Sequence, residues 1–201
     1  MAYFPFFIDL TGKKGLIVGG STVALRKVEK LLPYGPDLTV TAPQIHPELS
    51  SIPGLTLCMH PFCPEDLEGV FFVIAATDDR TLNHSIAALC RERSIPVNVV
   101  DDKEACTFLF PALVQKGALS VGISTGGASP TAAIWLKEQI SDLLPHNLDA
   151  ILAWLEEQRP VLKARFLDET ERSHQFARLF AAAMEAGRPL NGQEQEALFH
   201  A

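Results

Sequence analysis

The sequence predicts an α/β fold: a Rossmann-like doubly wound parallel sheet, then a small βα segment and a helical C-terminal part. Three observations support this prediction. Short apolar runs alternate with helical patterns over residues 14–100, glycines follow the first apolar run, and no strand pattern appears after residue 146. Strands that alternate with helices favour a parallel sheet with right-handed crossovers. We therefore expect three parts, with boundaries at residues 1–112, 113–145 and 146–201.

The first part should contain five strands. Residues 14–18 form a short apolar run between glycines, which suits a buried parallel strand. A helix over residues 23–32 follows from apolar residues at helical spacing, and Gly35-Pro36 should end it. Residues 70–76 are entirely apolar and should lie in the middle of the sheet. The remaining expected elements are strands at 38–41, 55–60 and 96–100 and a helix at 81–93.

The elements of the second half are expected as follows. Residues 107–110 and 119–124 have strand patterns, joined through residues 115–117. The small residues of 124–130 should form a turn that opens a helix over 131–144. Amphipathic helices follow at 148–155 and 161–184, with breaks expected at Pro160 and at residues 187–189.

The amino-acid composition limits the classes of protein to which this chain can belong. The 201 residues include 24 acidic and 17 basic side chains, a net charge of −7, and 47% are apolar. This composition predicts a folded protein, and an acidic chain without a basic block is a poor nucleic-acid binder. The longest apolar run is far shorter than the roughly 20 residues that span a bilayer, and no basic residue precedes the apolar N-terminal stretch, so neither a membrane protein nor a signal peptide is expected. We expect a cytoplasmic enzyme.

The four cysteines form no CxxC pair, so they suggest neither a disulfide framework nor a zinc knuckle. Cys58 and Cys63 flank His60, but the expected strand over this segment does not favour a metal site.

The first motif lies between the first strand and the first helix. Aligned on the dinucleotide fingerprint, it has Gly19 at the tight turn, Ser21 in place of the middle glycine and Ala24 at the helix–strand contact. A pyrophosphate would rest on the helix N-terminus, where the Ser21 hydroxyl could donate to it. The alternative is a glycine-rich turn that binds nothing. The expected cofactor residues here are Gly19, Gly20, Ser21, Thr22 and Val23.

Other strand ends should lie on the same rim, because parallel strands end at one edge of a sheet. The second strand ends in Thr41, Ala42 and Pro43 without the acidic residue that usually binds ribose, so the choice between NAD and NADP stays open. Later strands end near Thr77, Asp78, Asn98, Val99 and Asp101. A carboxylate such as Asp101 at the mouth of a cofactor crevice could act as a base; equally, it could be a turn or capping residue.

The third motif, Ser124-Thr-Gly-Gly-Ala-Ser-Pro130, has two compatible interpretations. Hydroxyls and glycines before a helix can form a turn that holds an anion. Ser129 is also a typical N-cap, followed by proline at the first helical position.

Six motifs in this order resemble one family. They are Phe6-Phe-Ile-Asp-Leu10, Val18-Gly-Gly with Val23-Ala-Leu-Arg-Lys27, Ala75-Ala-Thr-Asp-Asp79, Asn98-Val-Val-Asp101, Phe108 to Pro111, and Ser124 to Pro130. Together they resemble the precorrin-2 dehydrogenase and sirohydrochlorin ferrochelatase family, the N-terminal module of siroheme synthase. The resemblance covers residues 3–145, and the helical tail agrees only in length and character.

The resemblance implies a homodimer with an NAD-binding domain (1–112), a central dimerisation segment (113–145) and a helical C-terminal domain (146–201). It implies oxidation of precorrin-2 to sirohydrochlorin with NAD, and in some members insertion of Fe²⁺ to give siroheme. Asp101 takes the place of the catalytic aspartate. The residues expected to bind the polycarboxylate tetrapyrrole are Lys103, Phe108, Thr125, Gly126 and Ser129, and those expected at a metal are Asp101 and Thr125.

Two other functions stay open from the sequence. A non-catalytic Rossmann module that binds nucleotide or tetrapyrrole would explain Ser21 in the fingerprint. A chelatase without dehydrogenase activity would not need to admit a pyrophosphate at that turn.

Overall fold

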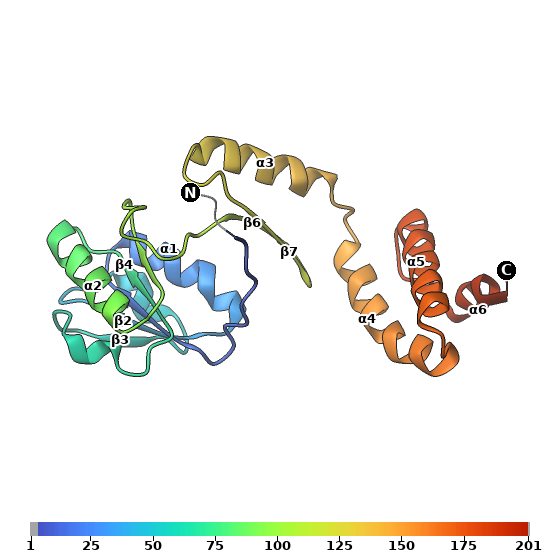
Figure 1. Cartoon of the computed structure of the whole chain (residues 1–201), viewed down its shortest axis with the longest axis horizontal. Coiled ribbons are helices and arrows are strands. Elements are labelled where there is room, and N and C mark those ends of the chain that lie inside the picture. The colour runs from blue at the N-terminus through green and yellow to red at the C-terminus, as the bar shows by residue number, and fades with distance from the viewer. Residues whose placement is uncertain (1–3, 201) are drawn as a thin grey trace. The chain divides into compact units, whose positions relative to one another are not determined.

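The computed structural model describes residues 4–200 and divides into two compact units, residues 4–110 and residues 111–200. The first unit is a five-stranded parallel sheet (Figure 1). Its strands are β1 (Lys14–Val18), β2 (Asp37–Thr41), β3 (Thr56–Cys58), β4 (Phe72–Ala75) and β5 (Val97–Val99). Their order is β3-β2-β1-β4-β5, with the topological switch between β1 and its neighbour β4. The predicted doubly wound sheet is confirmed, although several strands are shorter than expected.

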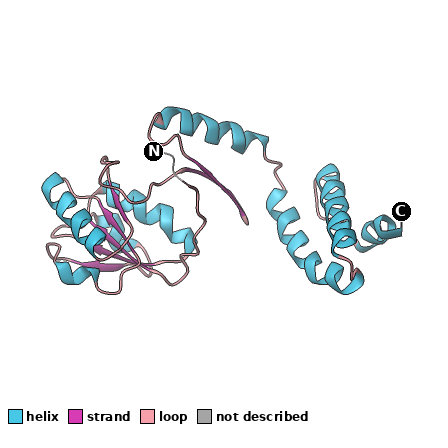
Figure 2. Ribbon diagram, viewed as in Figure 1, coloured by secondary structure: helices cyan, strands magenta, loops and turns pink. Residues whose placement is uncertain are grey.

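Helices cover the two faces of this sheet (Figure 2). Alternate residues of a strand point to opposite faces. Ile17 therefore packs in the core that contains α1 (Thr22–Leu31), whereas Leu16 and Val18 pack in the core that contains α2 (Arg80–Glu92). Short 3₁₀ helices, Leu32–Tyr34, Pro47–Ser51 and Pro64–Leu67, form the remaining regular turns of this unit.

Residues 107–110 do not form the strand that the sequence predicts. The amides of Thr107 and Phe108 both donate to the carbonyl of Val97, and the Val97 amide donates to the Thr107 hydroxyl at 2.7 Å. The segment therefore lies along the edge of β5, but a side chain replaces the backbone partner that a regular ladder needs.

The second unit begins with an antiparallel hairpin, β6 (Ala112–Lys116) and β7 (Leu119–Ile123). Its two-residue turn begins at Gly117, whose φ of 55° suits glycine. Helix α3 (Pro130–Leu143) packs on this hairpin and agrees with the predicted helix.

The rest of the second unit is helical: α4 (Leu148–Arg165), α5 (Glu169–Ala186) and α6 (Gly192–His200). Their core includes Ile151, Leu162 and Leu179. The break predicted at Pro160 is wrong, because α4 continues through it. Pro160 is exposed, so water can solvate the carbonyl group that loses its helical partner. Within residues 4–200, no helix combines the length and apolar character that crossing a bilayer requires.

Candidate functional site

The Gly19–Gly20 turn after β1 is enclosed by backbone. A Cβ atom on Gly19 would overlap the carbonyl of Ala76, and one on Gly20 would overlap the carbonyl of Gln44. Gly19, with a φ of 123°, also donates its amide to the Thr41 carbonyl at 3.0 Å. Only glycine fits here, so the turn brings the N-terminus of α1 against the ends of β2 and β4.

Ser21 is the N-cap of α1. Its hydroxyl oxygen accepts a hydrogen bond from the Val23 amide at 3.3 Å, which leaves the hydroxyl proton available to a ligand oxygen. The first turn of α1 contains no acidic residue, so the positive end of the helix dipole is not neutralised there. Thr22 is exposed and Val23 is half-buried. The N-terminus of α1 therefore carries a partial positive charge that would stabilise a bound anion.

The end of β2 contains an unsatisfied hydroxyl. Thr41 is fully buried, and its Oγ1 has no hydrogen-bond partner among residues 4–200. It lines a hollow of about 360 Å³ whose other polar lining residues include Lys14, Asp37 and Asp66. A buried hydroxyl without a partner costs free energy, so a ligand group or water in the hollow would be stabilised by it. Ala42 is buried, Pro43 is exposed, and no acidic side chain follows the strand before Gln44.

The end of β4 is fixed by Asn83. The Thr77 hydroxyl donates to Asn83 Oδ1 at 2.7 Å, and Asn83 Nδ2 donates to the Thr77 carbonyl at 2.9 Å. Asp79 caps α2 by accepting from the amides of Thr81 and Leu82. Asp78 is exposed between them. Thr77 is thus held by its own chain, and Asp78 presents its carboxylate to solvent at the rim.

Asp101 lies in the turn after β5 and is exposed. Its φ of 59° is in the left-handed region, which few residues other than glycine adopt without cost. Strain of this kind is often kept at functional sites when the surroundings hold it. Asp101 is a turn residue, and its role as a base stays a prediction.

The side chain that holds this turn is Cys106. Its Sγ accepts from the Val99 amide at 3.1 Å, and its single S–H has two acceptors within reach, the carbonyls of Val99 at 3.2 Å and Asp102 at 3.1 Å. Buried Asn98, predicted at the cofactor site, donates to the Phe108 carbonyl at 3.0 Å and to the Cys106 sulfur. The Asn98 side chain therefore helps to hold the segment that follows β5. Val99, also predicted at the cofactor site, is buried in the core.

Lys27, on α1, lies beside the Asp101 turn. Its Nζ is 4.1 Å from the centre of the Phe110 ring, a cation–π contact. Burial lowers the pKa of Lys27, as does the charge of Lys30, whereas the charge of Asp101 acts in the opposite direction. A cation and a carboxylate thus face the same end of the sheet.

The predicted substrate residues lie in both units. Lys103 is exposed in the loop after Asp101, and Phe108 is half-buried, with its ring 5.5 Å from that of Phe110. In the second unit, the Thr125 hydroxyl closes a loop: it donates to the Ser129 carbonyl and accepts from the Ser129 amide, both at 3.1 Å. Ser129 caps α3 through the Ala132 amide, which confirms the N-cap interpretation. Gly126 has a φ of 62°.

His84 and Asp102 form a pair that no sequence motif predicts. His84 Nε2 lies 2.8 Å from Asp102 Oδ2, and the Ala105 amide donates to Asp102 Oδ1 at 3.1 Å. The Ala105 hydrogen bond, ahead of the His84 contact, lowers the pKa of Asp102. No spacing signal could have found this pair, because its members belong to a helix face and a loop. The one feature of the sequence that pointed to this pair is that two aspartates, Asp101 and Asp102, follow a strand.

A parallel sheet in this order, with a glycine turn that leads into an uncompensated helix N-terminus, defines a Rossmann-like dinucleotide-binding domain. The chain belongs to the family described as "Putative NAD(P)-binding", whose model matches residues 6–112. A second model, "Sirohaem biosynthesis protein central", matches residues 116–143.

Similar proteins agree with this family. The siroheme synthase of Neisseria meningitidis serogroup C is 34% identical over 202 residues, and that of Photorhabdus laumondii is 38% identical over 200 residues. These matches cover 97% and 98% of this chain but 42% of each relative, so the chain spans less than half the length of these relatives. A solved structure named SirC, precorrin-2 dehydrogenase, has a TM-score of 0.72 at 26% identity and covers 98% of both chains. The resemblance inferred from the motifs is confirmed.

Proposed function

We propose that this protein oxidises precorrin-2 to sirohydrochlorin with NAD. The observation that supports this most is the likeness to the precorrin-2 dehydrogenase structure, because it extends over 98% of both chains and includes the helical part. The NAD(P)-binding family and the siroheme synthase relatives support the same reaction class.

The residues at the strand ends fit a dinucleotide. The N-terminus of α1 has no acidic side chain, so its free amides can bind an anion. In this proposal the α1 amides and Ser21 bind the pyrophosphate. The other residues proposed to line the cofactor site are Gly19, Gly20, Thr22, Val23, Thr41, Ala42, Pro43, Thr77, Asp78, Asn98 and Val99.

Asp101 is the proposed base. The oxidation removes a hydride and a proton from the tetrapyrrole, so the proton needs an acceptor. NAD, when bound, supplies the hydride acceptor. The Asp101 carboxylate takes the proton and, being exposed, passes it to water. In the first unit, Lys27 and Lys103 counter the charge of the substrate carboxylates, and Phe108 is a further proposed substrate residue. The proposed substrate residues of the second unit are Thr125, Gly126 and Ser129.

Iron insertion is a second proposed activity, in which Fe²⁺ is a substrate. Asp101 could accept the pyrrole protons that the metal replaces. Thr125 gives this step less support, since its hydroxyl already donates to and accepts from Ser129. Oxidation is therefore the function that we place first.

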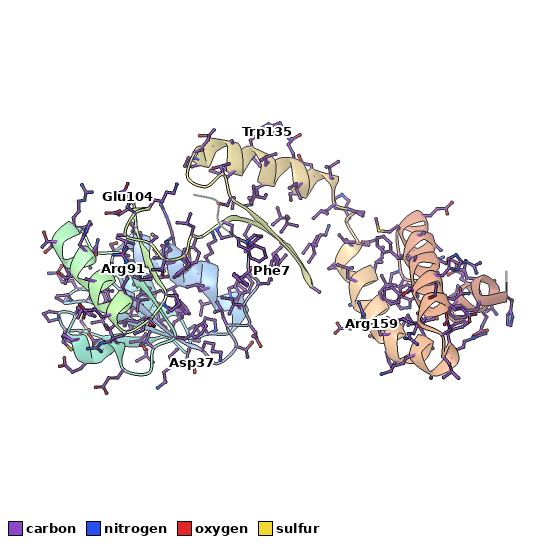
Figure 3. The ribbon with its side chains drawn as sticks, viewed as in Figure 1. Phe7, Asp37, Arg91, Glu104, Trp135 and Arg159 are labelled. Atoms are coloured by element: carbon purple, nitrogen blue, oxygen red, sulfur yellow. The ribbon has the colours of Figure 1, made fainter. Side chains whose placement is uncertain are left out.

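A homodimer is part of the proposal. Helix α3 exposes Ile134 and Trp135, 53% and 58% exposed, together with Leu143 (Figure 3 labels Trp135). Several exposed apolar side chains on one helix are typical of an association surface. Sedimentation velocity of the full chain would measure the dimer directly.

The test is an anaerobic assay with purified protein, enzymatically generated precorrin-2 and NAD. NADH and sirohydrochlorin should appear together, and a folded Asp101→Asn variant should produce neither at the wild-type rate. Absence of NADH above the enzyme-free control would contradict the proposal. Tetrapyrrole binding without conversion would then favour a carrier module, and iron insertion into supplied sirohydrochlorin without NAD would favour a chelatase.

A further inference from the structure

The connection between β3 and β4 brings three metal-ligating side chains together. The sequence suggested an extended segment over His60, but β3 ends at Cys58 and a 3₁₀ turn begins at Pro64. This turn folds Asp66 back onto Cys63. One potential ligand atom each from His60, Cys63 and Asp66 lies within 4.8 Å of the others.

The imidazole of His60 is oriented by its own backbone. Its Nδ1 lies 2.8 Å from the Pro61 carbonyl oxygen, an acceptor, so Nδ1 must be the protonated nitrogen. In the neutral ring, Nε2 then presents a lone pair to Asp66 Oδ1 at 3.8 Å. Two lone pairs repel unless a cation lies between them. This distance exceeds a hydrogen bond but suits two ligands of one ion.

The carboxylate of Asp66 is oriented as well. The Cys63 amide donates to Asp66 Oδ2 at 3.0 Å, which leaves Oδ1 on the side of His60. The Asp66 side chain is only 14% exposed, whereas that of His60 is 45% exposed. Backbone hydrogen bonds to a histidine nitrogen and to a carboxylate oxygen are the outer-shell contacts that orient ligands in metal sites.

We propose that His60, Cys63 and Asp66 bind a divalent transition-metal ion of the zinc class, with water at a fourth position. Nitrogen and sulfur donors select such ions over Mg²⁺ and Ca²⁺, which prefer oxygen. In a tetrahedral zinc site the ligand atoms are about 3.5 Å apart, so side-chain rotations that bring the donors about 1 Å closer complete the site. Asp66 also lines the hollow that Thr41 lines.

The test uses the full chain after treatment with a chelator, titrated with Co²⁺ and then with Zn²⁺. Co²⁺ bound to a thiolate gives a charge-transfer absorption in the near ultraviolet. We expect one equivalent of Co²⁺ to produce this band, and Zn²⁺ to remove it by displacement. Cys63→Ser should lose the band, and His60→Gln should weaken binding by more than about tenfold, because even outer-shell changes can cost that much.

Cys58→Ser is the matched control, since Cys58 is near in sequence but outside the cluster. It should keep the band. Circular dichroism checks that each variant is folded, and alkylation mapped by mass spectrometry gives a second readout: Zn²⁺ should protect Cys63 and leave Cys58 reactive. No band in the wild type, a band retained by Cys63→Ser, or one lost in Cys58→Ser would overturn the proposal. None of these results depends on NAD or a tetrapyrrole, so the proposed dehydrogenase is tested separately.

Discussion

His84 and Asp102 join helix α2 to the loop that contains Asp101, through a 2.8 Å contact between Nε2 and Oδ2. Nearby, the Arg91 guanidinium donates to the carbonyls of Glu104 and Ala105, so two side chains of α2 hold the same loop (Figure 3 labels Arg91 and Glu104). The left-handed turn at Asp101 is thus held from the side of α2 as well as by Cys106.

The Asp102 contacts should make stability depend on acid pH. The pKa of Asp102 is lowered in the fold from 3.8, first by the Ala105 amide. Its stabilisation is therefore present above pH 3.8 and is lost as the pH falls through the lowered value. Asp102→Asn should unfold at lower urea concentration than the wild type at pH 7, and the difference should shrink below pH 3.8. A constant difference over pH 7 to 3 would contradict this assignment.

Asp101→Asn should separate catalysis from folding. Asparagine tolerates a positive φ and keeps the shape of the side chain, so the melting temperature should stay close to that of the wild type. Loss of a general base typically lowers kcat by about 10²–10⁴-fold. The measurement is kcat for sirohydrochlorin formation, with NAD affinity determined by titration as the control. Wild-type turnover in the folded variant would remove Asp101 from the mechanism.

Ser21 can be tested with two substitutions that differ in one methyl group. Ser21→Ala removes the cap of α1 and should destabilise the protein by about 0.5–2 kcal/mol, whereas Ser21→Gly should cost only a few tenths. Because the Ser21 hydroxyl is proposed to donate to the pyrophosphate, both variants should bind NAD more weakly than the wild type. An affinity equal to that of the wild type in the folded Ser21→Gly variant would show that the hydroxyl does not contact the cofactor.

Cys90 should cause a loss of stability at alkaline pH. Burial raises its pKa from 9.0 to about 11. Below pH 9 the thiol is protonated in both states; between pH 9 and 11 the unfolded chain loses the proton first, so the free energy of unfolding falls. Cys90→Ala should be less stable by about 1 kcal/mol at pH 7 but should show a flatter decline. Equal slopes in both proteins would exclude this cause.

Much of the first unit could be predicted from sequence because its signals are local. Strand patterns, the Gly19-Gly20 turn and the caps at Ser21 and Ser129 depend on near neighbours. The predictions at 107–110 and Pro160 were wrong because distant context decided them: a Thr107 side chain on the edge of β5, and solvent beside an exposed helix face. The pairing of His84 with Asp102 joins residues 18 positions apart, so no short motif contains it.

The position of β1 in the middle of the sheet has a consequence for synthesis on the ribosome. Its two edges pair with Asp37–Thr41 and Phe72–Ala75, segments that are made later than β1 itself. Until residue 75 has emerged, one edge of the first strand has no partner, and Val97–Val99 must wait longer still to close the far side. The nascent chain therefore exposes apolar strand edges during most of its first hundred residues, which is the period when such edges invite aggregation.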